Sequence, residues 1–264
     1  MSLPVEVIEA VREGRCVLVL GSRASHEASI LAERDYPKAA ALARKLGWKR
    51  PRRLMGSKTR PEMPSVEKGA VAFEDANGRT QLIRELRGLV GCEGVEPSAA
   101  HRVAVQRFPV ILSTAWDDLL DRAAAGLGRE LQVVRRGESI PEATPQVGVL
   151  VKVRGGFDEP RSLLVTNLDH AERRFGTEVR RSMRSFFRDS VVLFVGLRPD
   201  EEEFDRLWED LTDAYGGELP RCHMAVAQGP MDDFLWQKWV WRGLLLFTAD
   251  PVECLTEIQE RLEG

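Results

Sequence analysis

The chain has few cysteines and lacks the close cysteine pairs that hold a metal or staple a small domain. Its four cysteines lie at positions 16, 92, 222 and 254, and no two of them form a CxxC motif. Structural zinc sites and disulfide frameworks depend on recurring close spacings of this residue. We therefore expect neither a metal site nor disulfides, and we expect a cytoplasmic protein from a reducing compartment.

Long hydrophobic runs and a strong net charge are also missing. No apolar run approaches the about 20 residues that span a bilayer, and residues 3–13 read as a short amphipathic helix, not a signal peptide. The formal net charge is only −3, so the chain as a whole has no strong attraction for nucleic acid or lipid. We expect no membrane partner. The basic stretch 49–60 is the one candidate contact for nucleic acid, but it lacks interleaved aromatic residues, so we expect no such partner either.

What the sequence does contain is a regular alternation of short apolar strands and helical segments. Strands are expected at 17–20, 110–114, 131–136, 147–153, 162–167, 191–195, 222–228 and 244–249. Helices are expected at 3–13, 79–90, 97–108, 119–127, 169–187, 199–216 and 251–262, with a loop at 48–66. This alternation predicts an α/β fold with a doubly wound, mostly parallel, Rossmann-like sheet and helices on both faces. We expect a single domain over 1–264 with a helical and loop insertion at about 26–96.

Four of these strands are each followed by a polar segment. The segments are GSRAS at 21–25, STAWD at 113–117, KVRG at 152–155 and GLRPDEEEF at 196–204. Open α/β sheets bind their ligands at the carboxyl ends of the strands. We therefore expect the four segments to lie together and to form a site.

In this order and spacing, and with LVTNLDH at 164–170 after the third, the segments resemble the sirtuin-like family. The resemblance is strongest to the bacterial branch whose members act as NAD-cleaving domains in antiphage defence, and it spans nearly the whole chain. In that family the four loops read GAGxS, TTNYD or TQNID, KLHG and G-[YT]-S-[LF]. The resemblance implies NAD or an ADP-ribose-like nucleotide as ligand. It also implies a protein partner or further domains of a longer chain.

Several loop residues match the family pattern. Gly21 matches a glycine that lets backbone N–H groups approach a pyrophosphate, while Thr114 and Asp117 match positions of the second loop. Asp117 also fits the simpler role of a carboxylate that starts the following helix. Our candidate nucleotide-binding residues are Gly21, Ser22, Arg23, Ser25, Thr114, Asp117, Arg154, Gly155, Gly196 and Arg198.

Two departures fall on positions that the resemblance marks as catalytic. Ala115 stands where the family has an asparagine that is implied to orient the ribose and the attacking water, and an alanine side chain offers neither donor nor acceptor. Arg154 stands where the family has its catalytic histidine. Arginine stays protonated and cannot accept a proton, as a histidine base does. We therefore assign no catalytic residue with assurance. The four histidines are His26, His101, His170 and His223, and of these His26 and His170 follow strands closely enough to approach the cleft.

Arginine replaces a family residue at Arg23, Arg154 and Arg198, and the sheet order would bring all three to one pocket mouth. One interpretation is a site retuned to hold a polyanion through charge-assisted hydrogen bonds without cleaving it. The other is a vacated pocket whose arginines pair with acids such as Asp117 and Asp118. A third interpretation is that the site keeps some catalytic activity.

These features predict a non-catalytic sirtuin-like domain that senses a nucleotide or ADP-ribose-type ligand, or binds a protein, in a prokaryotic defence or signalling system. The alternative is an NAD glycohydrolase effector with altered catalytic residues, so whether the chain is an enzyme stays open. A nucleic-acid-associated subunit using 49–60 is a third hypothesis. The tryptophan-rich segment 234–247 predicts either core packing or a partner surface.

Overall fold

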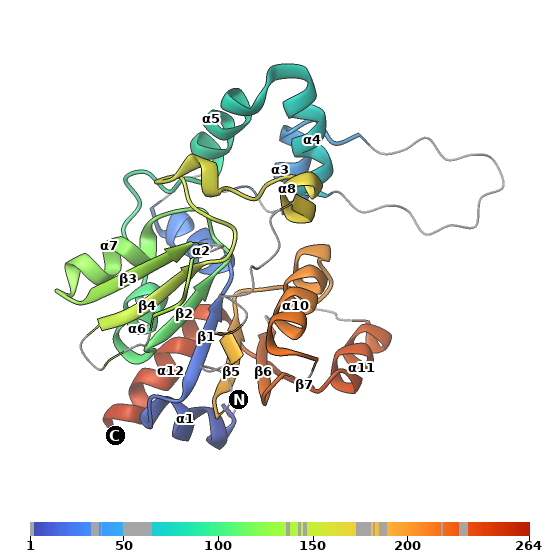
Figure 1. The fold of residues 1–264 in the computed structure, drawn as a ribbon. Helices are drawn as coiled ribbons and strands as arrows, with labels where there is room; N and C mark the ends of the chain where they lie inside the picture. The colour runs from blue at the N-terminus through green and yellow to red at the C-terminus, as the bar shows by residue number, and fades with distance from the viewer. Residues whose placement is uncertain are drawn as a thin grey trace.

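A computed structural model of the chain describes residues 3–32, 37, 39–49, 65–135, 138–141, 144, 147–172, 181, 183–184, 189–217, 219–226 and 232–264. Its centre is a seven-stranded sheet in the order β3-β4-β2-β1-β5-β6-β7, and every neighbouring pair of strands is parallel (Figure 1). The strands are β1 Cys16–Leu20, β2 Val110–Ser113, β3 Glu130–Arg135, β4 Val147–Lys152, β5 Val191–Val195, β6 Cys222–Val226 and β7 Leu244–Thr248. The predicted α/β class with a doubly wound parallel sheet is confirmed.

Helices connect the strands and cover both faces of the sheet (Figure 1). They are α1 Val5–Arg12, α2 Arg23–Leu31, α3 Ala39–Lys45, α4 Val66–Asn77, α5 Arg79–Val90, α6 Ala99–Arg107, α7 Leu119–Gly126, α8 Asn167–Glu172, α10 Glu202–Tyr215, α11 Asp233–Trp241 and α12 Pro251–Glu263, with a 3₁₀ turn at Pro160–Ser162. Within the part of the chain that the structure describes, no helix is both long and apolar enough to cross a bilayer.

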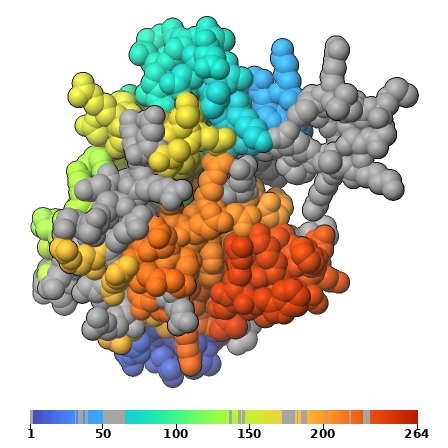
Figure 2. Space-filling model, turned by 45° about the vertical axis from the view of Figure 1, so that its right-hand side comes forward, coloured from blue at the N-terminus to red at the C-terminus, as the bar shows by residue number. Residues whose placement is uncertain are grey.

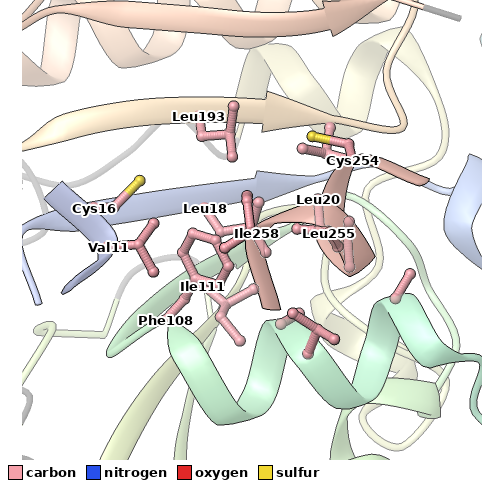
Figure 3. Close-up of a cluster of buried hydrophobic side chains, with 14 of the residues drawn as sticks. Val11, Cys16, Leu18, Leu20, Phe108, Ile111, Leu193, Cys254, Leu255 and Ile258 are labelled. Atoms are coloured by element: carbon pink, nitrogen blue, oxygen red, sulfur yellow. The ribbon is translucent and has the colours of Figure 1, made fainter. Parts of the chain in front are cut away.

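The central strands have no polar alternation because helices bury them on both sides. Leu18, Ile111 and Leu193 sit in register on three neighbouring strands and face one layer, where they join Phe108 and Ile258 in a hydrophobic cluster (Figure 3). That layer is formed by α1, α6, α7 and α12. The alternate strand residues face the opposite layer, formed by α10 and α11. The two-residue period of a strand thus divides one apolar run between two cores.

A third apolar cluster lies in the segment between β1 and β2. Leu42 of α3, Leu46 directly after it, and Leu82 and Leu86 of α5 pack there with Trp116 and other residues that follow β2 and β4. These helices stand above the carboxyl ends of the strands (Figure 1). Helix α4 was not anticipated from the sequence, although Ser65 caps its start by accepting a hydrogen bond from the Lys68 N–H at 3.3 Å. The insertion at about 26–96 contains α3 to α5, and its standing as part of one domain stays a prediction.

The expected strand at 162–167 is wrong. Its first residue ends a 3₁₀ turn and its last begins α8. The apolar residues between them, Leu163 to Val165, are fully buried as an irregular connection that contributes to the third cluster or packs beside it. Asp169 holds this connection by accepting the N–H groups of Val165 and Thr166, both at 2.9 Å. These residues are apolar because they are buried by tertiary packing, and an apolar run of this length has the same sequence pattern as a buried strand.

Two other expectations reach beyond the described residues. Most of the loop expected at 48–66 and of the basic stretch 49–60 falls on 50–64, and much of the helix expected at 169–187 falls on 173–180, 182 and 185–188. These segments lie outside the description.

We expect Leu18→Ala to lower the free energy of unfolding by about 3 kcal/mol, since it opens a cavity at the centre of the sheet. Val5→Ala is the matched control because Val5 is exposed on α1, and we expect it to change stability by at most about 0.5 kcal/mol. Urea denaturation followed by circular dichroism measures both variants. Equal effects would contradict the packing described for Leu18.

Candidate functional site

The four polar loops lie together at the carboxyl ends of the strands, as expected, because they follow the adjacent strands β4, β2, β1 and β5. From β1 the chain crosses to β2, β3 and β4 on one side and then returns to β5 on the other. The strand order therefore reverses between β1 and β5. Ligands of open α/β folds bind at such a switch point.

At this switch point the loops after β1 and β5 touch each other closely. The Gly21 N–H donates to the Val195 carbonyl at 2.8 Å, and a Cβ on Gly21 would lie 2.2 Å from the Gly196 carbonyl oxygen. Gly196 has φ +74°, a conformation that favours glycine. Its carbonyl accepts the N–H of Arg23, the first residue of α2, at 3.3 Å. The contact between the two loops therefore explains why both positions carry glycine. One of the N–H groups at the start of α2, that of Arg23, already has a hydrogen-bond acceptor within the protein.

Arg154 is buried just after β4, with 6% of its surface exposed. Its guanidinium carbon lies 4.3 Å from the ring centroid of Trp116. One guanidinium nitrogen lies 2.9 Å from Oε2 of Glu203 in α10, and the other lies 3.7 Å from Oε1 of Glu67 in α4. An aromatic face and two carboxylates therefore surround this cation and partly compensate its burial, while its Nε and one terminal nitrogen make no hydrogen bond with the described residues.

Glu67 is the buried acid of this group and was missed by sequence reasoning. Burial alone would raise its pKa, but the charge of Arg154 and hydrogen bonds from its own N–H and from Ser65 hold the pKa below its usual value. The Ser65 hydroxyl donates to Oε2 at 2.8 Å, and Arg206 lies 3.8 Å from Oε1. No local motif marks Glu67 as a site residue, because Arg154 and Arg206, the cations that it meets, come from distant parts of the chain.

The cavity next to Arg154 is small. Its volume is about 20 Å³, and its walls include Glu67, Thr114, Glu203 and His170. A cavity of this size holds about one water molecule. The position that the resemblance assigns to a catalytic imidazole is thus occupied by the chain's own ion pairs.

Arg198 pairs within its own loop. Its Nε and terminal nitrogen lie 2.9 and 2.5 Å from the two oxygens of Asp200, and this pairing lowers the pKa of Asp200. Arg23, half-buried at the start of α2, contributes further to lowering the same pKa. Among the residues that the structure describes, Arg154 and Arg198 share no acidic partner.

The pairing of arginines with nearby acids agrees with the vacated-pocket interpretation, but the named acids were wrong. Asp118 pairs with Arg122 along α7 at 2.9 Å, one helical turn away. Asp117 accepts the Leu119 N–H at 3.1 Å and so has the helix-start role. Both carboxylates therefore serve α7, because short-range partners are available to them there.

Several buried polar atoms of these loops have no hydrogen-bond partner among the described residues, including Nε1 of Trp116 and two guanidinium nitrogens of Arg154. The same holds for Oγ1 of Thr114 and Oδ2 of Asp117. Burial raises the pKa of Asp117, although hydrogen bonds from Ser25 and Leu119 act in the opposite direction. Buried unpaired oxygens are uncommon in folded proteins and mark places where a water or ligand can bind.

A wider groove opens beside this position. It measures about 540 Å³ and is bordered by Trp116, Asp117, Arg122 and Phe157, together with Arg87 of α5. This groove is larger than the cavity beside Arg154, and it is bordered by the predicted site residue Asp117. Gly155, with φ +73°, instead lies tightly against Ser162, and a Cβ there would meet its carbonyl oxygen at 2.3 Å.

The histidines have separate surroundings. His101 closes the start of α6 through a contact with Ser98 Oγ at 2.8 Å, and burial lowers its pKa to about 4. His223 lies in β6 with Nε2 3.3 Å from Glu6, and burial lowers its pKa as well. His26 belongs to α2, whereas His170 borders the small cavity of Arg154. Across the described ranges no cluster of three metal-ligating side chains occurs.

Glu27 of α2 faces Asp250, which caps α12. The Asp250 carboxylate accepts the Val252 N–H at 3.1 Å. Burial, followed by the hydrogen bond and charge of Asp250, raises the pKa of Glu27 to about 8. Glu27 therefore holds its proton at neutral pH, and the nearby Arg23 only partly opposes this.

Comparisons with known proteins agree with this arrangement. The family model described as "SIR2-like domain" matches residues 109–242. No curated protein matches. A solved complex of a SIR2 homolog with NAD has a TM-score of 0.53 and 12% identity, and the alignment covers 99% of this chain and 94% of that chain.

Two further structures are similar over nearly their whole length. One, from work on the structural basis of sirtuin substrate affinity, has a TM-score of 0.51 and 13% identity, covering 99% of each chain. The other is an ADP-ribose complex of a mutant Sir2 homologue, with a TM-score of 0.51, 10% identity and coverage of 99% and 97%. At such low identity these likenesses show the fold.

Arg154→Ala should lower the free energy of unfolding by about 3 kcal/mol, because it leaves the carboxylate of Glu67 buried without its main cation. Arg198→Ala is the control, since its ion pair is exposed, and we expect a loss below about 1 kcal/mol. Denaturant titration at neutral pH compares the two. A smaller loss for Arg154→Ala than for Arg198→Ala would contradict the assigned contacts.

The stability contribution of Glu27 should depend on pH. Because its folded pKa is raised from 4.5 to about 8, the contribution is complete below pH 4.5 and is lost as the pH rises through 8. Glu27→Gln cannot titrate, so its stability should fall less over this interval than that of the wild type. Thermal unfolding at a series of pH values measures the difference, with the exposed Glu9→Gln as control. Parallel curves for all three proteins would count against the Glu27–Asp250 pairing.

Proposed function

Because the chain belongs to the SIR2-like domain family, we propose that it is a non-catalytic member that serves as an interaction module of a prokaryotic defence or signalling system, in the cytoplasm. The observation that carries the proposal is the environment of Arg154, which is packed between Trp116, Glu203 and Glu67. The defence context is drawn from the resemblance of the four loops.

The proposal is supported by two groups that NAD cleavage would need and that the loops lack, a general base and an orienting amide. The resemblance assigns a general base to the position of Arg154 and an orienting amide to the position of Ala115. A guanidinium cannot accept a proton, and a methyl group cannot orient a ribose. A general base contributes about 10²–10⁴ in rate, so the loss of both groups removes most of the turnover that this mechanism provides.

The geometry also argues against an NAD-type nucleotide in the family's reacting position. The space beside Arg154 holds about 20 Å³, and the Gly196 carbonyl already accepts an N–H at the start of α2. The residues present therefore do not fit a ribose at this point. Instead, Arg154 links α4 and α10 to the loop after β4 and so holds a fixed surface above the sheet, as an interaction module requires.

A second candidate function is nucleotide sensing without cleavage. It is favoured by the unpaired Thr114 Oγ1 and Asp117 Oδ2 and by the 540 Å³ groove beside Asp117. Among the similar folds are complexes with NAD and with ADP-ribose. A nucleotide that also reached Arg154 would have to displace Glu203, so binding would reorganise α10.

An NAD glycohydrolase remains the enzymatic alternative. His170 is the histidine that borders the cavity next to Arg154. An active enzyme would use it, or a carboxylate of the same cavity such as Glu203, as the base.

The deciding experiment incubates the purified chain with NAD and measures nicotinamide release by chromatography. We expect no release above that of a buffer blank for the wild type, and the same result for His170→Ala, because Arg154 occupies the position that the resemblance assigns to the base and cannot accept a proton. Turnover by the wild type that His170→Ala abolishes would contradict the proposal and establish the enzymatic alternative.

Calorimetry with NAD and with ADP-ribose then separates the two non-catalytic functions. An absence of heat supports the interaction module. Binding that is lost in Thr114→Val or Asp117→Asn, but kept in the control Glu9→Gln on the exposed face of α1, would replace it with nucleotide sensing.

A further inference from the structure

The small polar cavity next to Arg154 lies where helices from three distant parts of the chain meet. Figure 2 shows that the parts of the chain that contain α4, α8 and α10, in teal, yellow and orange, adjoin on one face of the molecule. Residues of these helices border the cavity together with the loops after β2 and β4, through Glu67, Thr114, Arg154, His170, Glu203 and Arg206. The cavity therefore joins the inserted helices to α10 and to two loops of the sheet.

Three polar atoms of two residues at this cavity lack a partner. Nε and Nη2 of Arg154 make no hydrogen bond with the described residues, and neither does Oγ1 of Thr114. Nε and Nη2 form one edge of the guanidinium, the same edge with which Arg198 holds the two oxygens of Asp200. Arg154 and Thr114 are 6% and 2% exposed, so bulk solvent does not hydrate these atoms. Buried polar atoms without a partner are uncommon, because each has lost its hydration without gaining a hydrogen bond.

Glu67 supplies an acceptor at the same cavity, but its distances are too long for direct hydrogen bonds. Its Oε1 lies 3.7 Å from Nη2 of Arg154 and 3.8 Å from Nη1 of Arg206. A direct hydrogen bond between a nitrogen and an oxygen measures about 2.7–3.2 Å. Polar contacts longer than about 3.5 Å between buried groups are typical of pairs that a water molecule bridges.

The charges around the cavity favour an uncharged occupant. Two guanidinium groups and two carboxylates balance each other, and the carboxylate of Asp210 also borders the cavity. An anion would meet these carboxylates. A metal ion would meet the guanidinium groups, and within the described ranges no cluster of three metal-ligating side chains occurs. The volume of about 20 Å³ suits one water molecule.

We propose that this cavity binds one structural water molecule, which accepts a hydrogen bond from the Nε–Nη2 edge of Arg154 and donates to Oε1 of Glu67 and Oγ1 of Thr114. Three partners are the usual number for a buried water. The water completes the compensation of the Arg154 charge, which the two carboxylates provide only in part. It also ties α4 to the loops after β2 and β4. The inference does not depend on the function proposed for the chain, because it gives Thr114 a partner without a nucleotide.

A high-resolution crystal structure of the full chain, grown without nucleotide, tests the proposal directly. We expect one density peak about 2.7–3.2 Å from a guanidinium nitrogen of Arg154 and from Oε1 of Glu67. A second crystal grown in bromide distinguishes water from a halide, because bromide gives an anomalous signal and water gives none. An anomalous peak at this position, no peak at all, or a direct hydrogen bond between Arg154 and Glu67 would overturn the proposal.

A double-mutant cycle tests the same water in solution. Thr114→Val removes the hydroxyl and keeps the branched shape, while Glu67→Met keeps the length of the side chain and offers no carboxylate oxygen. No direct hydrogen bond joins the two side chains, since Oγ1 of Thr114 has no partner among the described residues. A shared water makes the two changes non-additive. We expect the effect of Thr114→Val on the unfolding equilibrium constant to be at least about threefold smaller in the Glu67→Met background.

Urea denaturation of the wild type, the two single variants and the double variant measures this coupling. The control cycle pairs Thr114→Val with Glu9→Met on the exposed face of α1, and there we expect additive effects. Additive effects in both cycles would contradict a shared water. The crystal structure requires no variant, so it decides the question even if Glu67→Met is too unstable to measure.

Discussion

The buried guanidinium of Arg154 constrains the rest of the site. A cation removed from water requires nearby carboxylates, and the two that answer this need are Glu203 of α10 and Glu67 of α4. Trp116 closes the remaining side. One side chain after β4 thereby fixes the positions of a helix that follows β5 and of a helix inserted between β1 and β2, and these helices in turn decide how much space is left at the sheet edge.

Glycine at the switch point illustrates how one residue type can serve two purposes. In a nucleotide-binding loop, glycine allows the backbone to approach phosphate. Here Gly21 and Gly196 allow two loops to approach each other, and a Cβ on Gly21 would collide with the Gly196 carbonyl. The same sequence signature is therefore compatible with a ligand cradle and with a closed contact. The difference lies in the path of the second loop.

Much of the fold was predictable because a buried strand appears in the sequence as a short continuous run of apolar residues. The apolar runs of β1, β2, β4 and β5 and the polar segments after them indicated the sheet and the end of it at which the four loops meet. The expectation for 162–167 failed because three buried residues under a neighbouring cluster have the same apolarity as a central strand. Within the site, the arginines were recognised but their partners were not, since Glu67 stands far from Arg154 in the chain and carries no local motif.

The sequence by itself determined the α/β class, the order of the polar loops, and the presence of Arg154 and Ala115 where the resemblance implies an imidazole and an amide. These features follow from residue identities and from the spacing of apolar residues within a segment, which can be read without knowing how the segments pack. Only the tertiary structure decided which acids neutralise Arg154, that the space beside it shrinks to about 20 Å³, and that Trp239 of the tryptophan-rich segment is buried whereas Trp241 is exposed. Those outcomes depend on contacts between distant segments, whose energies exist only once the helices have packed on the sheet.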